Sequence, residues 1–162
     1  MFLCCDDKQQ VLDLHETAAI LKVILDLLHS PPTQPVQDKL ESDGKRSYDA
    51  STVIPLPLLS VMMTLADKYA LPTTTVECLG THLEAHAQSD PLRVYGLATL
   101  HNLDNTASFA SQFIAPLSSY QPHQVREIPT LEAYQKVLRL QAFRVTALQK
   151  LLLAEEIFPH GR

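Results

Sequence analysis

Apolar residues recur at a spacing of three to four along almost the whole chain, and this period constrains the fold more than any other feature. Such spacing places apolar side chains on one face of an α-helix, whereas a half-buried strand would alternate them. Prolines divide the pattern into segments, because proline cannot continue a helix and disfavours helix in the residue before it. The sequence therefore predicts a mainly α-helical protein with helices at about residues 17–30, 57–69, 72–88, 91–102, 104–115 and 130–156.

Several predicted helices begin at residues that can cap a helix. Thr17 and Thr130 stand where a side-chain oxygen can accept a hydrogen bond from the first helical amides. Asp90-Pro91 joins a capping residue to a proline suited to the first turn, and Asp104 can cap the helix that follows. If the last helix continues to about residue 156, it is roughly 40 Å long.

Three stretches depart from the helical period. Residues 10–14 form a short apolar run compatible with a β-strand. Residues 37–52, the polar insertion, carry little that can be buried, so we expect them to be disordered. Residues 115–129 contain three prolines and predict a linker.

Two features predict packing inside the helical bundle. Gly80 lies within a predicted helix, where glycine costs about 1 kcal/mol relative to alanine. A close approach of a second helix would explain it. Met62 and Met63 follow the apolar helical pattern, so we expect core positions for them rather than an adaptable binding surface.

Charge and glycine content argue against several classes of ligand. The chain has 162 residues and a net charge of -5, with its basic residues spread out, whereas nucleic-acid binding proteins usually present a basic face. The four glycines are far apart, whereas loops that cradle phosphate groups need clustered glycines. We therefore expect neither nucleic-acid binding nor a nucleotide-binding loop.

The cysteines favour a reducing compartment. Cys4, Cys5 and Cys78 are odd in number and include an adjacent pair, which makes a poor disulfide framework. The first residues lack the basic and apolar regions of a signal peptide. The uncharged stretch at residues 50–66 contains prolines and is shorter than the roughly 20 residues that span a bilayer. We therefore expect an intracellular protein, cytoplasmic or nuclear, without a membrane segment.

His82 and His86 are the best candidates for a metal site. Their spacing of four places both imidazoles on one helix face, where a zinc ion could bridge them. Cys78 could join them as a third ligand or as the nucleophile of a Cys–His pair. The zincin motif needs glutamate directly after the first histidine, and Leu83 stands there. We therefore expect surface histidines and a packed free thiol, with no catalytic residue, metal or cofactor.

Several segments resemble the BTB/POZ domain, in particular that of fungal proteins. The most specific match is Leu-Ala-Asp-Lys-Tyr-Ala-Leu-Pro at residues 65–72, which is similar to the end of a helix in that family. Residues 11–32 resemble the strand and helix of the domain, and residues 92–98 and 131–140 resemble helices that follow it.

This resemblance implies a domain organisation. It covers most of residues 1–140 and lacks the N-terminal strand–helix half of the domain, as in a truncated domain. It implies a partial BTB/POZ-like domain at residues 1–90, which keeps the helical half with one short strand. A helical extension at residues 91–156 would follow.

The resemblance also implies a function. BTB/POZ proteins are commonly adaptors that bind themselves, cullin-type ubiquitin ligases or transcription-related complexes. Partner contacts would draw on the helix at residues 57–69 and the helix after residue 91, and we single out Leu58, Met62 and Tyr69. The helical period is also compatible with a core position for each of these three residues.

Two other functions stay open at this point. The chain could be a truncated fragment without independent function. It could also be a small metal-dependent hydrolase that uses His82, His86 and Cys78.

Overall fold

A computed structural model describes residues 16–38 and 47–153 of the chain. These residues form a mainly α-helical protein, which confirms the predicted class. The helices are α1 (Ala18–His29), α2 (Leu56–Lys68), α3 (Thr73–Ala85), α4 (Pro91–Leu100), α5 (Asp104–Ser111), the 3₁₀ helix η1 (Leu117–Ser119), α6 (Pro122–Val125) and α7 (Leu131–Leu152). The strand predicted at residues 10–14 lies outside the described residues.

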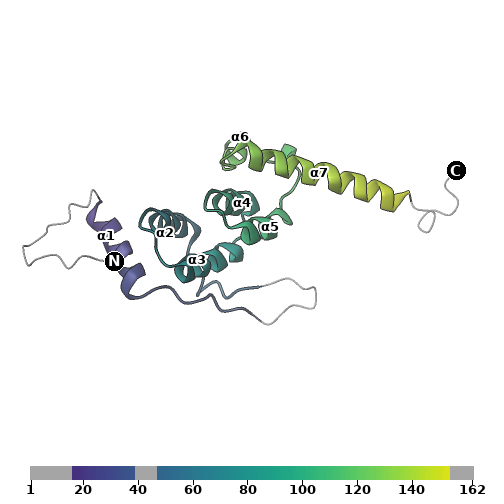
Figure 1. Cartoon of the computed structure of the whole chain (residues 1–162). Coiled ribbons are helices and arrows are strands. Elements are labelled where there is room, and N and C mark those ends of the chain that lie inside the picture. The colour runs from purple at the N-terminus through teal and green to yellow at the C-terminus, as the bar shows by residue number, and fades with distance from the viewer. Residues whose placement is uncertain (1–15, 39–46, 154–162) are drawn as a thin grey trace, which may run out of the picture.

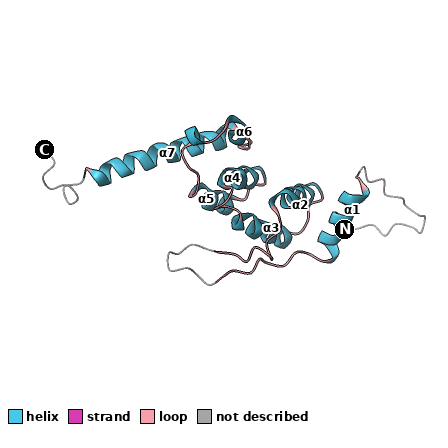
Figure 2. Cartoon of the chain, turned by 180° about the vertical axis from the view of Figure 1, so that it is seen from behind, coloured by secondary structure: helices cyan, strands magenta, loops and turns pink. Residues whose placement is uncertain are grey.

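Two helical hairpins make up the body of the molecule. Figure 1 shows α2 above α3 and, beside them, α4 above α5, with α1 at one end of the row. The short α6 and the long α7 run across the top, and the C-terminal part of α7 extends past the hairpins. The view from behind in Figure 2 shows the same order and no strand in the described part of the chain.

One hydrophobic core joins α2 to α7. Its most deeply buried side chains are Leu59 of α2, Leu79 and Leu83 of α3, Val94 of α4 and Val137 of α7. Burial of each such side chain stabilises the folded state by about 1.5–3 kcal/mol relative to leaving it in water. The core continues across residue 90, so the segments expected to form a partial domain and its extension share one core.

The linker predicted at residues 115–129 is wrong, because this stretch folds and packs. It contains η1 and α6, and Ile128 after α6 is buried in the core. The chain reaches α4 at Gly96, where an added β-carbon would overlap the backbone carbonyl of Glu127. Only glycine, which has no side chain, allows this approach.

The contact at Gly80 is looser than predicted. A β-carbon added there would lie 3.6 Å from Leu103 Cδ1 and 3.7 Å from Thr106 Oγ1, which are ordinary van der Waals distances. Gly80 does face another helix, α5, but a methyl group would fit between them. The helix contact predicted at Gly80 is therefore present, but it does not require glycine, and the restrictive glycine is Gly96.

The predicted capping residues divide into two groups. Thr17 and Thr130 each accept a hydrogen bond from the amide three residues later, at 3.4 and 3.1 Å, as predicted. Asp90 stands at the N-cap of α4 without a capping side-chain bond, and Asp104 is the first residue of α5 rather than its cap. α7 ends at Leu152, so at 1.5 Å per residue it is about 33 Å long.

Left-handed residues close the first helix of each hairpin. Ala70 follows α2 with φ 47° and Asn102 follows α4 with φ 56°. In both turns the next amide donates to the carbonyl five residues earlier, at 2.9 and 2.8 Å. These Schellman-type ends satisfy helix carbonyls and let the chain reverse into α3 and α5.

The polar insertion is ordered at both of its described ends, where the prediction of disorder is wrong. Gln37 and Tyr48 form an antiparallel bridge, and the amide of Asp38 donates to the carbonyl of Ser47 at 2.9 Å. Residues 39–46 between them lie outside the described residues.

The two helical glycines predict opposite effects of the same substitution. We expect Gly96→Ala to lower the free energy of unfolding by about 2–3 kcal/mol, because the methyl group overlaps rigid backbone. Gly80→Ala is the matched control and should raise it by up to about 1 kcal/mol through helix propensity. Chemical denaturation of the purified variants measures both. Equal effects of the two substitutions would contradict the close approach at Gly96.

Candidate interaction surfaces

The three residues predicted to contact a partner have different surroundings. Leu58, near the start of α2, is 43% exposed. Met62, one turn later, is partly buried against the core, and Met63 is buried in it. The core prediction is therefore confirmed for Met63 and only in part for Met62. Tyr69 follows the last residue of α2 and is partly buried. Of the three, Leu58 has the most surface left for a partner.

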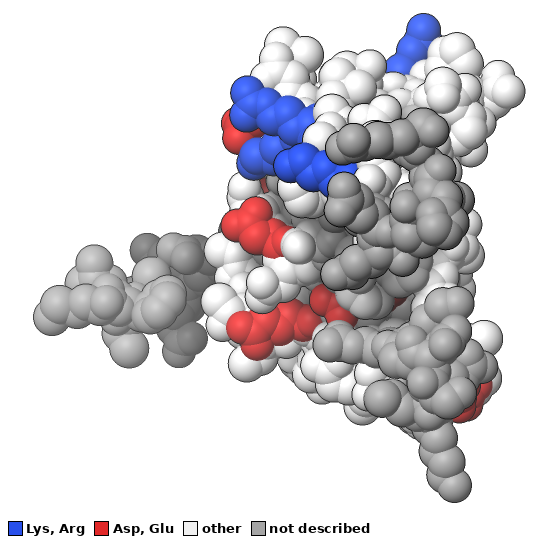
Figure 3. Space-filling model, turned by 90° about the vertical axis from the view of Figure 1, so that its right-hand side faces the viewer, with Lys and Arg blue, Asp and Glu red and all other residues white. Residues whose placement is uncertain are grey.

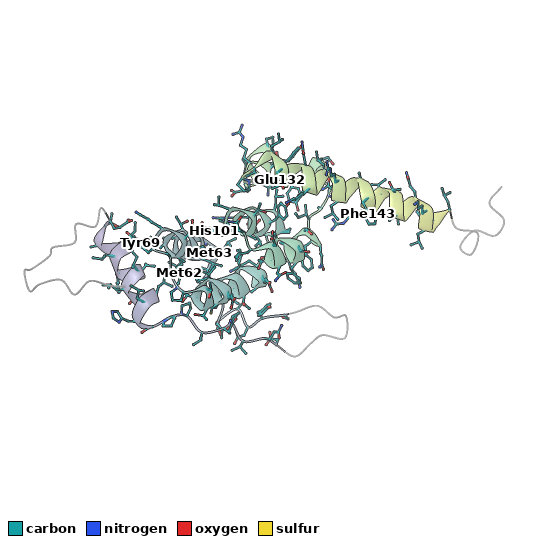
Figure 4. The ribbon with its side chains drawn as sticks, in the orientation of Figure 1. Met62, Met63, Tyr69, His101, Glu132 and Phe143 are labelled. Atoms are coloured by element: carbon teal, nitrogen blue, oxygen red, sulfur yellow. The ribbon has the colours of Figure 1, made fainter. Side chains whose placement is uncertain are left out.

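Tyr69 forms a contact within the chain. Its hydroxyl donates to Glu16 Oε1 at 3.1 Å, and the ammonium of Lys68 forms an ion pair with the same carboxylate. The hydrogen bond from Lys68 is the main reason that the pKa of Glu16 is lowered. These bonds tie the end of α2 to the residues that precede α1, beside which Tyr69 lies in Figure 4.

His82 and His86 share one face of α3 and bind backbone groups there. Nδ1 of His82 accepts a hydrogen bond from the amide of Ile54 at 3.3 Å. Its other nitrogen, Nε2, must then carry the proton, which it donates to the carbonyl of Thr33 at 2.9 Å. Nε2 of His86 lies 2.8 Å from the carbonyl of Ile54.

Cys78 completes this set one turn earlier. Its thiol donates to the carbonyl of Pro32 at 3.1 Å. We call Cys78, His82 and His86 the α3 clasp, because they fasten the chain on both sides of the polar insertion to α3. The expectation that both histidines lie exposed at the surface is wrong, since His82 is 1% exposed and His86 is partly buried.

The clasp lacks the features of a metal or nucleophile site. Both nitrogens of His82 are already bonded, so a metal would have to displace backbone partners. No group of three or more metal-ligating side chains occurs in residues 16–38 and 47–153. Cys78 is a buried free cysteine, as predicted, and burial raises the pKa of its thiol, whereas a nucleophilic cysteine needs a lowered pKa. The clasp therefore gives no support to the hydrolase hypothesis.

A small cavity lies between α2, α3 and the end of α4. It has a volume of about 50 Å³ and is lined by Met63, Val76, Leu79 and His101. Nε2 of His101 is buried and has no hydrogen-bond partner among the described residues. Burial lowers the pKa of His101, and the carboxylate of Asp67 opposes this shift. The size suits a few water molecules, which could satisfy that nitrogen, rather than a larger ligand. Figure 4 shows His101 close to Met63.

Two larger hollows open to solvent. One, of about 260 Å³, lies between α4, α5 and α7, and its apolar lining comprises Tyr95, Ala107, Val137 and Leu140. The other, of about 460 Å³, lies between α3 and the turn from α4 into α5. Its lining is mostly polar, with acidic groups at Glu77, Glu84 and Asp104.

The C-terminal part of α7 is the most exposed apolar surface of the described chain. Arg144 is the last α7 residue hydrogen-bonded to another described element, donating to the carbonyls of Ser111 at 2.7 Å and Ile114 at 3.0 Å. Residues 145–153 are all exposed, and Phe143 is 70% exposed. Figure 4 places Phe143 where α7 leaves the body. The apolar period of the sequence does not predict this surface, because it does not show where the core beneath a helix ends.

No protein-family model matches the chain, and no curated protein or solved structure matches it. None of the helices in the described part of the chain is long and apolar enough to cross a membrane.

The α3 clasp predicts a stability that depends on pH. Burial is the main cause of the lowered pKa of His82, and the nearby His86 lowers it further, while the hydrogen bond to Thr33 opposes the shift. The folded state therefore binds its proton at lower pH than the unfolded state. The contribution of His82 is fully present above a pH of about 6.5 and is lost as pH falls below that value.

We expect the free energy of unfolding to drop between pH 7.5 and 5.5, by at most about 1.4 kcal/mol for each buried histidine. His82→Gln, which keeps a donor but does not titrate, should flatten this dependence, whereas His123→Gln at an exposed site should not. Denaturation curves at the two pH values measure the effect. If the free energy of unfolding of His82→Gln drops between pH 7.5 and 5.5 by as much as that of the wild type, His82 does not contribute to the pH dependence of stability.

Proposed function

We propose that the chain is a protein–protein interaction module. The observation that carries this proposal is the part of α7 beyond Arg144, which keeps helical order while its apolar side chains face solvent. Leu148 and Leu151 are 55% and 58% exposed, and Leu153 is 82% exposed. Contiguous apolar surface of this kind typically marks a site for a partner.

A second apolar surface supports the same proposal. The pair α1 and α2 exposes side chains that a bundle would otherwise cover, namely Leu25 and Leu28 of α1 and Leu58 and Val61 of α2. Leu58 is among them, so this surface includes one of the contact residues suggested by the sequence. It lies at the opposite end of the molecule from the tip of α7 (Figure 1).

We further propose that the module is of BTB/POZ type and acts inside the cell, as an adaptor for a cullin-type ubiquitin ligase or a transcription-related complex. The support is the resemblance at residues 65–72, which fall at the end of α2 and the turn into α3. The continuous core from α2 to α7 favours this proposal over a fragment without independent function.

Affinity capture with the tagged full chain, from extracts of its own cells, tests the interaction module. We expect proteins that bind the wild type and Thr146→Asp but are lost with Leu148→Asp. Thr146 is the matched control, since it is exposed in the same turns of α7 but already polar. If the three chains recover the same proteins, α7 is not an interaction surface.

Titration with the purified amino-terminal domain of a cullin tests the adaptor role. We expect binding that Leu58→Asp weakens about tenfold, because a charge replaces an apolar contact. Leu148→Asp, at the other end of the molecule, should leave the affinity unchanged. A wild-type chain that does not bind the cullin domain would remove the ubiquitin-ligase assignment.

A further inference from the structure

The exposed part of α7 carries an apolar seam with coiled-coil spacing. Leu138, Val145, Leu148 and Leu152 are separated by seven, three and four residues, and they are 42–56% exposed. This spacing aligns side chains along one side of a helix. We call these four residues the α7 seam.

A large aromatic residue lies on the other side of the same helix. At 100° per residue, Phe143 falls on the side of α7 away from the α7 seam, and it is 70% exposed. A helix that is apolar on opposite sides is typically enclosed rather than laid against a single surface. This arrangement favours a partner that surrounds α7.

After its first turn, which contains Glu132, α7 carries only positive charge. Between Ala133 and Leu153 the chain contains basic residues and no Asp or Glu. Lys136 pairs with Glu132 at 3.0 Å, and Arg144 is bonded to backbone carbonyls of the body. These basic residues are Lys136, Arg139, Arg144 and Lys150.

Arg139 and Lys150 form no ion pair with another described residue, and they flank the exposed stretch on the side of Phe143. A partner that encloses α7 would therefore have to match apolar side chains together with unpaired positive charge. Acidic groups around an apolar channel supply that match.

A second copy of the chain fits this surface poorly. Two copies of residues 138–153 placed side by side would bring only positive charges together. The acidic hollow beside Glu77, Glu84 and Asp104 would match the charge, but its lining is mostly polar and leaves the α7 seam without apolar contacts.

An anionic membrane also fits poorly. A lipid surface takes one side of a helix, so it would leave either Phe143 or the α7 seam in water. Figure 3 looks onto the C-terminal end of α7 and shows Lys and Arg side chains in the upper part of the face, with an acidic side chain beside them and further Asp and Glu side chains below.

We propose that residues 145–153 of α7, together with the exposed Phe143, are a docking helix for an acidic protein whose apolar groove encloses the helix beyond Arg144. The part of the α7 seam beyond Arg144 would enter the groove, Phe143 would pack against its far wall, and Arg139 and Lys150 would meet acidic groups at its rim. This inference rests on the proposed function, since it names the kind of partner for the same surface.

Calcium-loaded calmodulin is a suitable probe, because its acidic, methionine-rich grooves enclose basic amphipathic helices. Isothermal titration of the full chain with this probe should give a micromolar dissociation constant. Excess EDTA, which closes the grooves, should abolish binding. Raising the salt concentration from 50 to 300 mM should weaken it severalfold.

Matched variants test each part of the inference. Leu148→Asp and Phe143→Asp should each weaken binding more than tenfold, and Thr146→Asp less than threefold. The charge reversal Arg139→Glu with Lys150→Glu should weaken it at least tenfold. The melting temperature of each variant should match the wild type, since these side chains lie outside the core.

Three results would overturn the inference. The first is no binding of calcium-loaded calmodulin at 100 μM by a chain that melts cooperatively. The second is binding to vesicles rich in phosphatidylserine that depends on Leu148 but not on Phe143. The third is a concentration-dependent dimer, seen by sedimentation, that Leu148→Asp dissolves. If capture from extracts still depends on Leu148 while the probe fails, the interaction module stands and only the acidic partner is rejected.

Discussion

The close approach between α4 and the chain after α6 determines where the rest of the C-terminal region lies. Gly96 lets the carbonyl of Glu127 rest directly on α4, and Ile128 follows into the core. The hydroxyl of Tyr95, the residue before Gly96, donates to the carbonyl of Ala133 at 3.1 Å and holds the first turn of α7. α7 therefore starts against α4, and its length carries its end past the body.

α3 has a comparable role on the other side of the molecule. Leu79 and Leu83 enter the core, while the α3 clasp on another face holds the chain on both sides of the polar insertion. A spacing of four suits a zinc ion, but it suits two successive backbone groups of an extended segment equally well. Here the ring nitrogens of His82 are occupied by the backbone groups of Thr33 and Ile54, and Nε2 of His86 binds the carbonyl of Ile54.

Local signals predicted most of the helices, because period, proline and capping residues act within a few positions of each other. Thr17 and Thr130 illustrate this, since each caps an amide three residues away. The errors fell where distant residues meet. Ile54 and His82 are 28 residues apart in the chain, and Gly96 meets Glu127, so no local pattern shows that His82 is buried or which glycine is restrictive.

The same limit applies to the candidate surfaces. Leu58, Met62 and Tyr69 follow one helical pattern. Only tertiary packing separates the exposed leucine from the methionine that packs against the core and from the tyrosine bonded to Glu16. At the end of α7 the same apolar pattern that is buried at Val137 continues in leucines that are exposed to solvent.

The α3 clasp has a consequence for how this protein can vary. His82 binds Thr33 and Ile54 at once, and Asp38 meets Ser47 further along the same two segments. The ends of the insertion are thus brought together by the folded body itself. Because Asp38 and Ser47 are joined, the loop-closure cost of a longer connection between them rises slowly, by about 0.6 kcal/mol for each doubling of its length. An epitope, a recognition peptide or a small domain placed between them would start and end at positions that the body already holds together.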